Sequence, residues 1–440
     1  MNGRQSIAVI GAGWAGCTAA MDLTEAGFAV TLFESARTLG GRARTVKIQN
    51  TLLDNGQHIL LGAYTQTLSQ LQKAGVDTAQ ALLRLPLQMR YPPNDDGMTF
   101  VTPPLPAPLH MLVGLWRASG LTREDKMALA RFTTTARWMD WQLDEDCSVA
   151  TLLDRFDQTE RLIALMWRPL CIAALNTPIE RASAQVFLNV LHDSLGARRT
   201  ASDMLLPRVD LGALLPDYAA RYITQYGGNI SCGTTVKTLH STQQGWSVTC
   251  SGGQTRSFDG IVVATSASAA VSLLNDLDEI TLSALEFEPI TTCYLQYAPD
   301  IRLPDPMYAL CDDADNHRWG QFVFDRGQLH SDQHGLLAVV ISTAAQAADV
   351  AQDQLAAMVA RQLAQVFDRS ELGAPLWTQV ITEKRATFAC TPALKRVKEE
   401  TVYDNLVLAG DYLASPYPAT LESAVRSGQQ AARLLTEHFS

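Results

Sequence analysis

The stretch SIAVIGAGWAGCTAA, residues 6–20, decides the fold of this chain. An apolar run, Ile7–Ile10, leads into three spaced glycines, and a helix-like stretch, Trp14–Ala26, follows them. A second apolar run, Phe28–Phe33, comes next and ends at the acidic residue Glu34. Short apolar runs on either side of a helical pattern predict a strand–helix–strand unit with parallel strands.

The three glycines are Gly11, Gly13 and Gly16, and each has a separate task in such a unit. The first permits the tight turn, the second lets the backbone approach a pyrophosphate, and the third lets the helix pack on the strand. The helix N-terminus offers unpaired N–H groups to phosphates, and Glu34 can accept hydrogen bonds from a ribose. The pattern therefore predicts a site for an adenosine diphosphate group, as part of either NAD or FAD.

Composition and charge narrow the range of partners. The chain has 440 residues, 47% of them apolar, which is enough for two or three domains with a sizeable core. Its net charge is −10. Because phosphate binding needs a basic surface, we expect no nucleic-acid partner.

The cysteines and histidines are scattered along the chain. None of the eight cysteines forms a C-x-x-C pair, which favours reduced thiols in a cytoplasmic protein and gives no metal-ligand cluster. The strand–helix–strand unit explains the N-terminal apolar stretch better than a signal peptide does. No run of 18 apolar residues occurs, so we expect no transmembrane helix.

The nucleotide unit does not continue as a simple Rossmann domain. Helical patterns dominate the middle third, and strand patterns return later, with one strand predicted over Asn229–Ser241 and one helix over Ala344–Phe367. We therefore predict an α/β fold in which a discontinuous Rossmann-like domain carries an inserted α+β substrate domain. The predicted parts are a nucleotide domain (1–85, 205–275 and 395–440), a mostly helical substrate or cap region (86–204) and an antiparallel-sheet substrate region (276–394).

Two further motifs extend the predicted site. Gly40-Gly41-Arg42 follows Glu34 closely, and its glycines allow close backbone approach while Arg42 can pair with a phosphate. Ala409-Gly410-Asp411 follows a buried strand and can place a carboxylate against a ribityl or ribose hydroxyl. The helix that begins near Leu421 would aim its positive end at a cofactor ring. The alternatives are an ordinary glycine turn with a surface arginine and a simple strand–turn–helix that closes the sheet.

The segments VIGAGWAGCTAA (9–20), FESARTLGGRART (33–45) and LVLAGDYLASPYPATLESAVRSG (406–428) together resemble the flavin amine oxidase and phytoene desaturase superfamily of FAD enzymes. The resemblance implies FAD as the cofactor in place of NAD, and it implies a backbone contact from Val236 to the adenine. No second G-x-G-x-x-G occurs, so we expect no dedicated NAD(P)H domain. The electron donor stays open.

The inserted segments carry a closer resemblance. DNGQHILLGAY (54–64), WRPLCIAALNTP (167–178) and SDMLLPRVDLGALLP (202–216) are similar to the hydroxysqualene dehydroxylase family of FAD oxidoreductases. That family acts in the reductive direction in hopanoid biosynthesis, removing a hydroxyl from hydroxysqualene to yield squalene. The resemblance implies a long apolar isoprenoid substrate, an apolar tunnel that excludes water, and a donor that assists the departing hydroxyl.

Three polar residues in these segments are candidate catalytic residues: His58, Asn176 and Asp203. Each has a structural alternative. His58 can be a satisfied histidine beside the flavin, Asp203 a helix cap or turn residue, and Asn176 a loop residue. Asp54 can hold the DNGQH turn.

The stretch FVTPPLPAPLHMLVGLW, Phe100–Trp116, combines long apolar side chains with prolines. One interpretation is a lip that contacts the inner face of a membrane peripherally and admits a lipid substrate. The other is a buried connection between domains.

Other functions stay open at this point. A carotenoid or squalene desaturase would use the same cofactor with the hydride moving in the opposite direction. A non-catalytic prenyl-lipid escort protein on the same fold is opposed by the intact set of glycines with Glu34, Arg42 and Asp411. An amine oxidase is less favoured because neither an aromatic cage nor a lysine near the flavin can be placed, although Tyr412 and Tyr417 lie in the corresponding loop.

Overall fold

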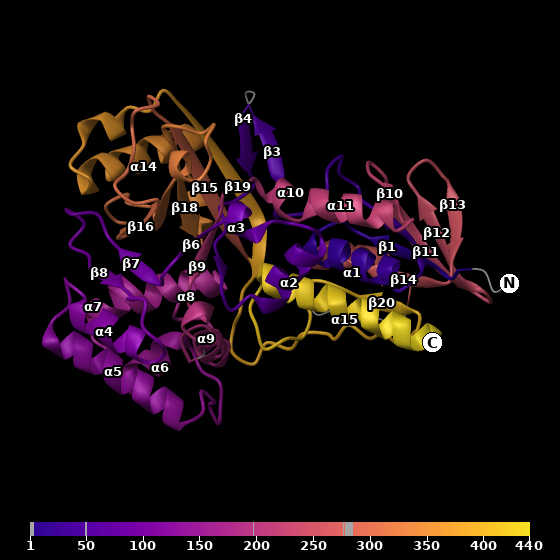
Figure 1. Cartoon of the computed structure of the whole chain (residues 1–440), viewed down its shortest axis with the longest axis horizontal. Helices are drawn as coiled ribbons and strands as arrows, with labels where there is room; N and C mark the ends of the chain where they lie inside the picture. Colours follow the sequence, from indigo (N-terminus) through magenta and orange to yellow (C-terminus); the bar gives the residue numbers. More distant parts are fainter. Residues whose placement is uncertain (1–3, 49–50, 197, 276, 278–284) are drawn as a thin grey trace.

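A computed structural model describes residues 4–48, 51–196, 198–275, 277 and 285–440. Figure 1 shows three regions that meet near the middle of the molecule: a parallel sheet with its helices, an antiparallel sheet, and a group of helices. The C-terminus lies at the far end of the parallel-sheet region.

The parallel sheet is assembled from strands that are far apart in the sequence. Its order is β10-β2-β1-β14-β20, and each neighbouring pair is parallel. This architecture confirms the predicted α/β fold with a Rossmann-like sheet. The strand bounds are β1 Ser6–Ile10, β2 Ala29–Phe33, β10 Asn229–Ser231, β14 Gly260–Val263 and β20 Leu406–Leu408.

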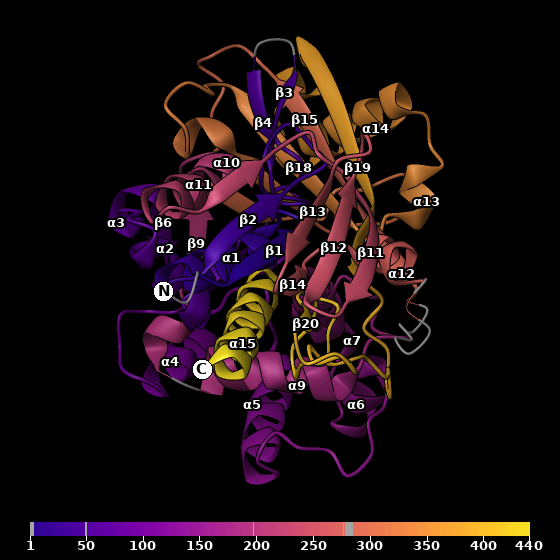
Figure 2. The ribbon, with the colours of Figure 1, turned by 90° about the vertical axis from the view of Figure 1, so that its right-hand side faces the viewer.

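Helices cover one face of this sheet, and a small antiparallel sheet covers the other. On the helical face, α1 (Trp14–Glu25) contacts both α11 (Pro216–Gln225) and α15 (Leu421–Phe439). Figure 2 shows the small sheet on the opposite side of β1 and β14. Because both faces are covered, β1, β2, β14 and β20 are almost wholly apolar, whereas the edge strand β10 carries Asn229 and Ser231. The covering strands are β11 Val236–Thr242, β12 Gly245–Cys250 and β13 Thr255–Phe258.

Two predicted elements are divided in the structure. The pattern over Asn229–Ser241 predicts one strand, but β10 and β11 belong to different sheets. Gly233, with φ of +66°, turns the chain between them, in a conformation that glycine adopts without strain. The predicted helix Ala344–Phe367 is also two helices, α13 (Ala345–Ala348) and α14 (Gln352–Val366), because the backbone at Ala351 is extended.

The second large sheet is antiparallel, with the order β16-β17-β18-β15-β19. Side chains alternate along β15: Cys293 and Leu295 pack in one apolar cluster with α14, whereas Tyr294 belongs to the cluster shared with the helical region. The sheet thus has one face on its own helices and one face toward the rest of the molecule. The strand bounds are β15 Phe287–Gln296, β16 Met307–Ala309, β17 Phe322–Asp325, β18 Leu336–Ser342 and β19 Trp377–Phe388.

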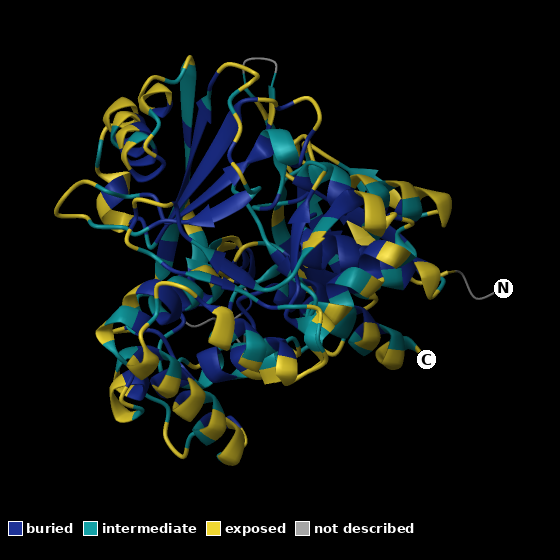
Figure 3. Ribbon diagram, turned by 60° about the vertical axis from the view of Figure 1, so that its left-hand side comes forward, coloured by how far each residue is buried: buried dark blue, intermediate teal, exposed yellow. Residues whose placement is uncertain are grey.

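The helical region is built around aromatic side chains. The ring of Trp167 lies 4.3 Å from that of Phe132 and 6.2 Å from that of Phe187. Figure 3 shows burial concentrated in the sheets and on the inward sides of helices. The helices are α4 Leu109–Arg117, α5 Arg123–Trp138, α6 Val149–Arg155, α7 Glu160–Leu162, α8 Arg168–Leu175 and α9 Ala184–Leu191, with π-helical turns at Ile163–Trp167 and His192–Gly196.

Short elements connect the three regions. β3 pairs with β4, β7 pairs with β8, and β9 lies between β5 and β6. Among the residues that the structure describes, no helix is long and apolar enough to cross a membrane. The predicted domain limits stay a prediction. The connecting elements are β3 Thr45–Ile48, β4 Thr51–Asp54, β5 Leu60–Leu61, β6 Leu82–Leu85, β7 Gln88–Arg90, β8 Thr99–Val101, β9 Met204–Pro207, α2 Thr65–Lys73, α3 Thr78–Ala81, α10 Leu211–Leu214 and α12 Ala267–Leu274.

Candidate functional site

The glycine loop after β1 leaves open space at the start of α1. A Cβ on Gly11, which has φ of +101°, would lie 2.6 Å from the backbone oxygen of Ala264. A Cβ on Gly16 would lie 1.9 Å from the oxygen of Gly11, so helix and strand are too close for a side chain there. A Cβ on Gly13, the N-cap of α1, would meet nothing within 4 Å. The open side of Gly13 and a helix end without a side-chain cap fit a phosphate group.

Glu34 stands just after β2, and its buried carboxylate faces the same loop. The two carboxylate oxygens accept hydrogen bonds from the backbone N–H groups of Ala12 and Ala36, each at 2.8 Å. Each oxygen keeps further lone-pair capacity for a ribose hydroxyl. The N–H of Thr234 donates to the backbone oxygen of Glu34 at 2.9 Å, so Val236, two residues further on, lies near this end of the sheet.

The Gly40-Gly41-Arg42 turn packs directly on the glycine loop. The N–H of Gly40 donates to the oxygen of Ala12 at 2.8 Å, and a Cβ on Gly41 would lie 3.1 Å from the Cα of Gly13. The guanidinium of Arg42 donates to Asp411 Oδ1 at 2.6 Å and to the oxygen of Ala386 at 2.5 Å. The structure therefore brings three predicted segments together and pairs Arg42 with a carboxylate, while its contact with a phosphate stays a prediction.

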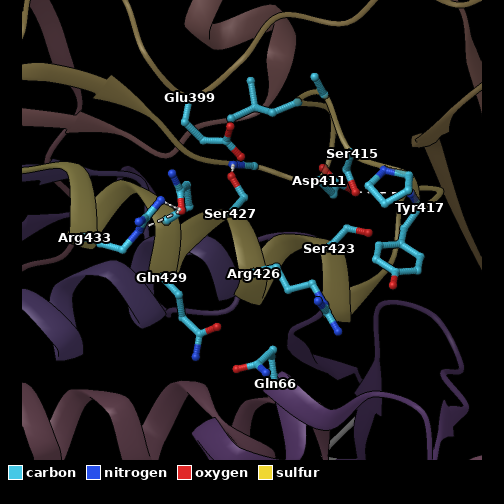
Figure 4. Close-up of a pocket in the computed structure, with 15 residues that line it drawn as sticks. Gln66, Glu399, Asp411, Ser415, Tyr417, Ser423, Arg426, Ser427, Gln429 and Arg433 are labelled. Atoms are coloured by element: carbon cyan, nitrogen blue, oxygen red, sulfur yellow. Dashed lines mark hydrogen bonds between the residues drawn. The ribbon is translucent and has the colours of Figure 1, made fainter. Parts of the chain in front are cut away.

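Asp411 lies between β20 and α15, in a loop that is held at several points. The N–H of Gly410 donates to Ser427 Oγ at 3.0 Å, and α15 begins at Leu421, as predicted, with Thr420 as its side-chain cap. Figure 4 shows α15 forming one wall of a cavity of about 460 Å³ and the 411–417 loop forming another. The cavity residues labelled in the figure are Gln66, Glu399, Asp411, Ser415, Tyr417, Ser423, Arg426, Ser427, Gln429 and Arg433.

Tyr412 offers a hydrogen-bond donor beside Arg42 and Asp411. Its side chain is buried and lines a small cavity with Arg42, Phe287 and Phe388. Its hydroxyl has no hydrogen-bond partner within the described part of the chain. Burial raises the pKa of Tyr412 above its ordinary value, so the hydroxyl keeps its proton at neutral pH. A buried donor without a partner fits a ligand that carries carbonyl or hydroxyl groups.

The DNGQH segment follows β4 and lies against the Arg42 turn. Asn55 donates from Nδ2 to the backbone oxygen of Arg42 at 3.1 Å. His58 Nδ1 lies 2.9 Å from the oxygen of Gly56, and because a carbonyl only accepts, Nδ1 carries the proton. Burial lowers the pKa of His58, so the imidazole is neutral at pH 7 and Nε2 is an acceptor. This protonation state suits His58 to orient a donor better than to release a proton.

A buried arginine, Arg326, holds the DNGQH segment in place through two of the segment's side chains. Arg326, fully buried, donates from Nη1 to Asp54 Oδ2 at 3.1 Å and to Gln57 Oε1 at 3.0 Å. Asp54 also accepts the N–H of Leu211, the first residue of α10, at 2.8 Å. The interpretation of Asp54 as the residue that holds the DNGQH turn agrees with these contacts. Sequence reasoning missed Arg326, because it lies in a segment with no recognisable motif.

Two more titratable groups surround Arg326. Asp210 Oδ1 lies 3.7 Å from Arg326 Nη2, and neither atom has a hydrogen-bond partner among the described residues. Burial and the charge of Asp54 raise the pKa of Asp210 to about 6. Burial and the charge of Arg326 lower the pKa of His330 to about 3. The cluster therefore holds one permanent cation, a neutral imidazole and two carboxyl groups, and burial raises the pKa of both Asp54 and Asp210.

The other two candidate catalytic residues are engaged elsewhere. Asp203 is buried and bonded to Arg84 Nη1 at 2.9 Å, and its backbone oxygen accepts the N–H of Gly62 at 2.8 Å. β5 pairs with β9 so that Leu61 lies opposite Met204. His58 and Asp203 bond to different partners, the backbone oxygen of Gly56 and the guanidinium of Arg84 respectively. Asp203 makes an ion pair and caps no helix.

Asn176 ends α8 in the left-handed conformation, with φ of 44°. Its Nδ2 donates to Thr387 Oγ1 at 2.9 Å, and its Oδ1 accepts the N–H of Thr343 at 2.8 Å. The amide thereby ties the helical region to the antiparallel sheet. The catalytic roles of Asn176, His58 and Asp203 stay predictions, as do the cofactor contacts of the individual binding residues.

No group of His, Cys, Asp or Glu side chains within residues 4–48, 51–196, 198–275, 277 and 285–440 is arranged to hold a metal ion.

Comparisons with known proteins agree with this geometry. The family model described as flavin containing amine oxidoreductase matches residues 14–436. The chain is 27% identical to hydroxysqualene dehydroxylase of Rhodopseudomonas palustris, over 98% of each chain, and 26% identical to that of Zymomonas mobilis, over 98% of this chain and 99% of the other. It is 22% identical to a zeta-carotene desaturase of Capsicum annuum, over 98% of this chain and 81% of the other.

Solved structures share the fold. An oxidoreductase from Methanosarcina mazei superposes with a TM-score of 0.72 at 14% identity, covering 97% of this chain and all of the other. Cyclohexylamine oxidase from Brevibacterium oxydans superposes with a TM-score of 0.67 at 15% identity, covering 99% of both chains.

Proposed function

The chain belongs to the flavin containing amine oxidoreductase family and is an FAD-dependent oxidoreductase, and from this premise we propose that it removes the hydroxyl group of hydroxysqualene reductively to give squalene. The observation that carries the proposal is the likeness to hydroxysqualene dehydroxylases over nearly the whole of both chains. This likeness includes the inserted segments around His58, Asn176 and Asp203. It therefore extends beyond the nucleotide fingerprint that the whole superfamily shares.

The residues of the site divide into cofactor and substrate ends. Gly11, Gly13 and the start of α1 would hold the pyrophosphate, Glu34 the adenosine ribose, and the Arg42–Asp411 region the flavin side of FAD. When bound in its reduced form, FAD supplies a hydride. The start of α15 lies close to Asp411 in sequence and offers a positive helix end to an electron-rich ring.

The substrate is an allylic alcohol whose hydroxide leaves poorly. The C–O bond breaks and the hydroxyl leaves with one proton as water, while a hydride forms the new C–H bond. Both the hydride and the proton would come from fully reduced FAD, FADH2, as it returns to FAD. In this proposal the DNGQH segment orients the hydroxyl, with His58 Nε2 accepting its hydrogen bond. Arg326 and Asp54 keep that segment in place. Asp203 and Asn176 remain proposed participants on the basis of the resemblance alone.

An anaerobic assay tests the proposal. Purified protein loaded with FAD and reduced chemically should convert hydroxysqualene to squalene, detected by gas chromatography with mass spectrometry. The same protein with oxidised FAD should give no squalene. Retention of FAD together with an inert hydroxysqualene would contradict the proposal.

A desaturase is the second candidate, and the likeness to a zeta-carotene desaturase over 98% of this chain and 81% of the other favours it over an amine oxidase. The same site would then accept a hydride from an isoprenoid instead of delivering one. Oxidised protein incubated with squalene or a carotenoid precursor and an electron acceptor would form a product with an added double bond. That outcome would replace the first proposal.

A further inference from the structure

One surface of the helical region is unusually apolar. On α4, Leu109, Leu112 and Trp116 are 49%, 55% and 75% exposed, and their spacing of three and four residues places them on one side of the helix. The opposite side is buried through His110 and Gly114. The two interpretations of Phe100–Trp116 therefore apply to different parts of it. Phe100 is buried, as in a buried connection, whereas the exposed apolar residues lie in α4 at the end of the stretch.

The next helix continues this surface. On α5, Met127 is 62% exposed and Trp138 is 88% exposed. Lys126 Nζ donates to the backbone oxygens of Trp116 at 2.9 Å and Ala118 at 2.7 Å, which ties the start of α5 to the end of α4. Figures 1 and 2 both place the two helices in the lower part of the molecule, with α5 below α4. Five of the ten large apolar side chains exposed in the described part of the chain lie within residues 109–138.

The charge of this surface differs in sign from that of the whole chain. Residues 109–138 contain five basic and two acidic residues, a net charge of +3, whereas the chain carries −10. Asp125 is buried in the capping box of α5, where its carboxylate accepts the N–H of Thr122 at 2.8 Å. The structure describes every residue of this segment, and its one exposed carboxylate is that of Glu124. The segment has four exposed arginines: Arg117, Arg123, Arg131 and Arg137.

We propose that α4 and α5 dock on the surface of an anionic lipid bilayer. The leucine, methionine and tryptophan side chains would enter the headgroup boundary, where tryptophan is favoured, and the arginines would lie near the lipid phosphates. Three acidic residues, Asp140, Asp144 and Glu145, follow α5 in the sequence, so the basic and apolar stretch ends with that helix. The purpose of docking, access to a long apolar substrate dissolved in the bilayer, rests on the proposed function, but the binding itself does not.

Vesicle sedimentation tests the proposal without any substrate. FAD-loaded protein should sediment with vesicles of phosphatidylcholine and phosphatidylglycerol, and it should bind vesicles of phosphatidylcholine alone more weakly. Leu112→Asp/Trp116→Asp should bind the anionic vesicles at least about tenfold more weakly, because it replaces apolar contact with charge. The matched control is Leu376→Asp/Val402→Asp, which changes two exposed apolar residues outside α4 and α5 and should bind as the wild type does.

The arginines are tested separately. Arg123→Glu/Arg131→Glu should weaken binding to the anionic vesicles by about fivefold or more per position, with little effect on neutral ones. Unchanged melting temperature and flavin absorbance of each variant would show that folding and FAD loading are intact. Binding is independent of turnover, so a protein that docks but leaves hydroxysqualene unchanged would contradict only the proposed function.

Several results would overturn the docking proposal. These are absence of wild-type binding to anionic vesicles, equal binding by Leu112→Asp/Trp116→Asp and the wild type, or equal losses in the test and control pairs. A wild-type dimer in the absence of lipid that becomes monomeric in Leu112→Asp/Trp116→Asp would show instead that a second copy covers the surface.

Discussion

The carboxylate of Glu34 performs two tasks at one position. It accepts the N–H groups of Ala12 and Ala36, which shapes the glycine loop, and it faces the site predicted for the ribose. Glu34→Ala should therefore weaken FAD retention about tenfold and lower the free energy of unfolding by about 1–3 kcal/mol, because two N–H donors lose their acceptor. Flavin absorbance after dialysis and urea denaturation measure the two effects.

Glu25→Ala is the matched control for this variant. Glu25 is the last residue of α1, the helix that begins at the glycine loop. Its side chain is half exposed beside Lys73. It should keep wild-type flavin occupancy. Undiminished occupancy in Glu34→Ala would contradict the assignment of the cofactor site.

Arg326 holds the DNGQH segment through Asp54 and Gln57, so its replacement should lower the stability of the protein. Arg326→Met would leave the buried carboxylate of Asp54 without its cation, so we expect a loss of about 3–5 kcal/mol in the free energy of unfolding. Adding Asp54→Asn should recover part of the loss, because the double variant removes the unpaired charge. Arg361→Met, on the exposed side of α14, should change stability by less than about 0.5 kcal/mol. Full stability of Arg326→Met, measured by denaturant titration, would show that the cluster does not anchor the segment.

His330 gives the fold a defined sensitivity to acid. Its pKa is lowered to about 3 by burial and by Arg326, below the ordinary value of about 6.5 in the unfolded chain. The unfolded chain therefore takes up a proton first as the pH falls, and stability present above pH 6.5 is lost progressively toward pH 3. Between pH 7 and pH 5 this histidine alone should remove about 2 kcal/mol.

His330→Gln removes that contribution, so its free energy of unfolding should fall by about 2 kcal/mol less between pH 7 and pH 5 than that of the wild type. Denaturant titration at both pH values measures the difference. His240→Gln, at an exposed position on β11, should behave as the wild type does. An identical pH dependence of His330→Gln and the wild type would refute the argument.

Site residues were predictable from the sequence where the geometry that requires them involves only neighbouring positions. Gly11 and Gly16 were predictable because a turn and a close helix–strand contact need glycine within a few positions of each other. Arg326 was not, because its partner is remote: Asp54 lies 272 positions from Arg326, and nothing near Arg326 in sequence indicates the contact. Asn176 shows the opposite case, in which a conspicuous polar residue is fully occupied by the fold.

At the scale of elements, the glycine loop between β1 and α1 has two tasks: Gly16 allows the helix to pack closely, and Gly13 leaves space for a pyrophosphate. Gly16→Ala would place a Cβ 1.9 Å from the oxygen of Gly11, so α1 must shift, and this outweighs the gain of about 1 kcal/mol in helix propensity. Gly13→Ala meets open space and should fold normally, but its methyl group occupies the side on which a pyrophosphate would lie.

We expect Gly16→Ala to melt below the wild type even without FAD, and Gly13→Ala to melt as the wild type does without FAD but to bind FAD more weakly. Thermal melting without FAD and FAD titration by flavin fluorescence separate the two outcomes. Equal loss of stability in both variants would show that the loop serves the fold alone.

Element boundaries were predictable where hydrophobic periodicity and a turn signal coincide. β1, α1 and β2 follow the pattern because each is bounded by glycine or by an acidic residue. The division of Asn229–Ser241 into β10 and β11 was not predictable, because a strand-like pattern is the same whether the chain stays in one sheet or crosses to another at Gly233.

For the whole molecule, the predicted cofactor site joins segments from the two ends of the chain. Arg42 and Asp411 are 369 positions apart and form one ion pair. FAD that contacts both should stabilise the whole chain, by about 2.7 kcal/mol at a free concentration one hundred times its dissociation constant. Scanning calorimetry should show the main transition of the protein moving upward with FAD, and ADP alone should have a smaller effect. A melting temperature that is independent of FAD would contradict this coupling.

The order of strands in the parallel sheet has a consequence for biosynthesis. β1 and α1 are made first, whereas β20 and α15, which complete the sheet and cover α1, are made last. At about 5–20 residues per second, the first strand waits roughly 20–80 seconds for the last one. During that interval the nascent nucleotide unit is a half-built sheet with an uncovered helix, which is the kind of surface that chaperones shield. The ion pair between Arg42 and Asp411 therefore cannot form until β20 and the loop after it have been made.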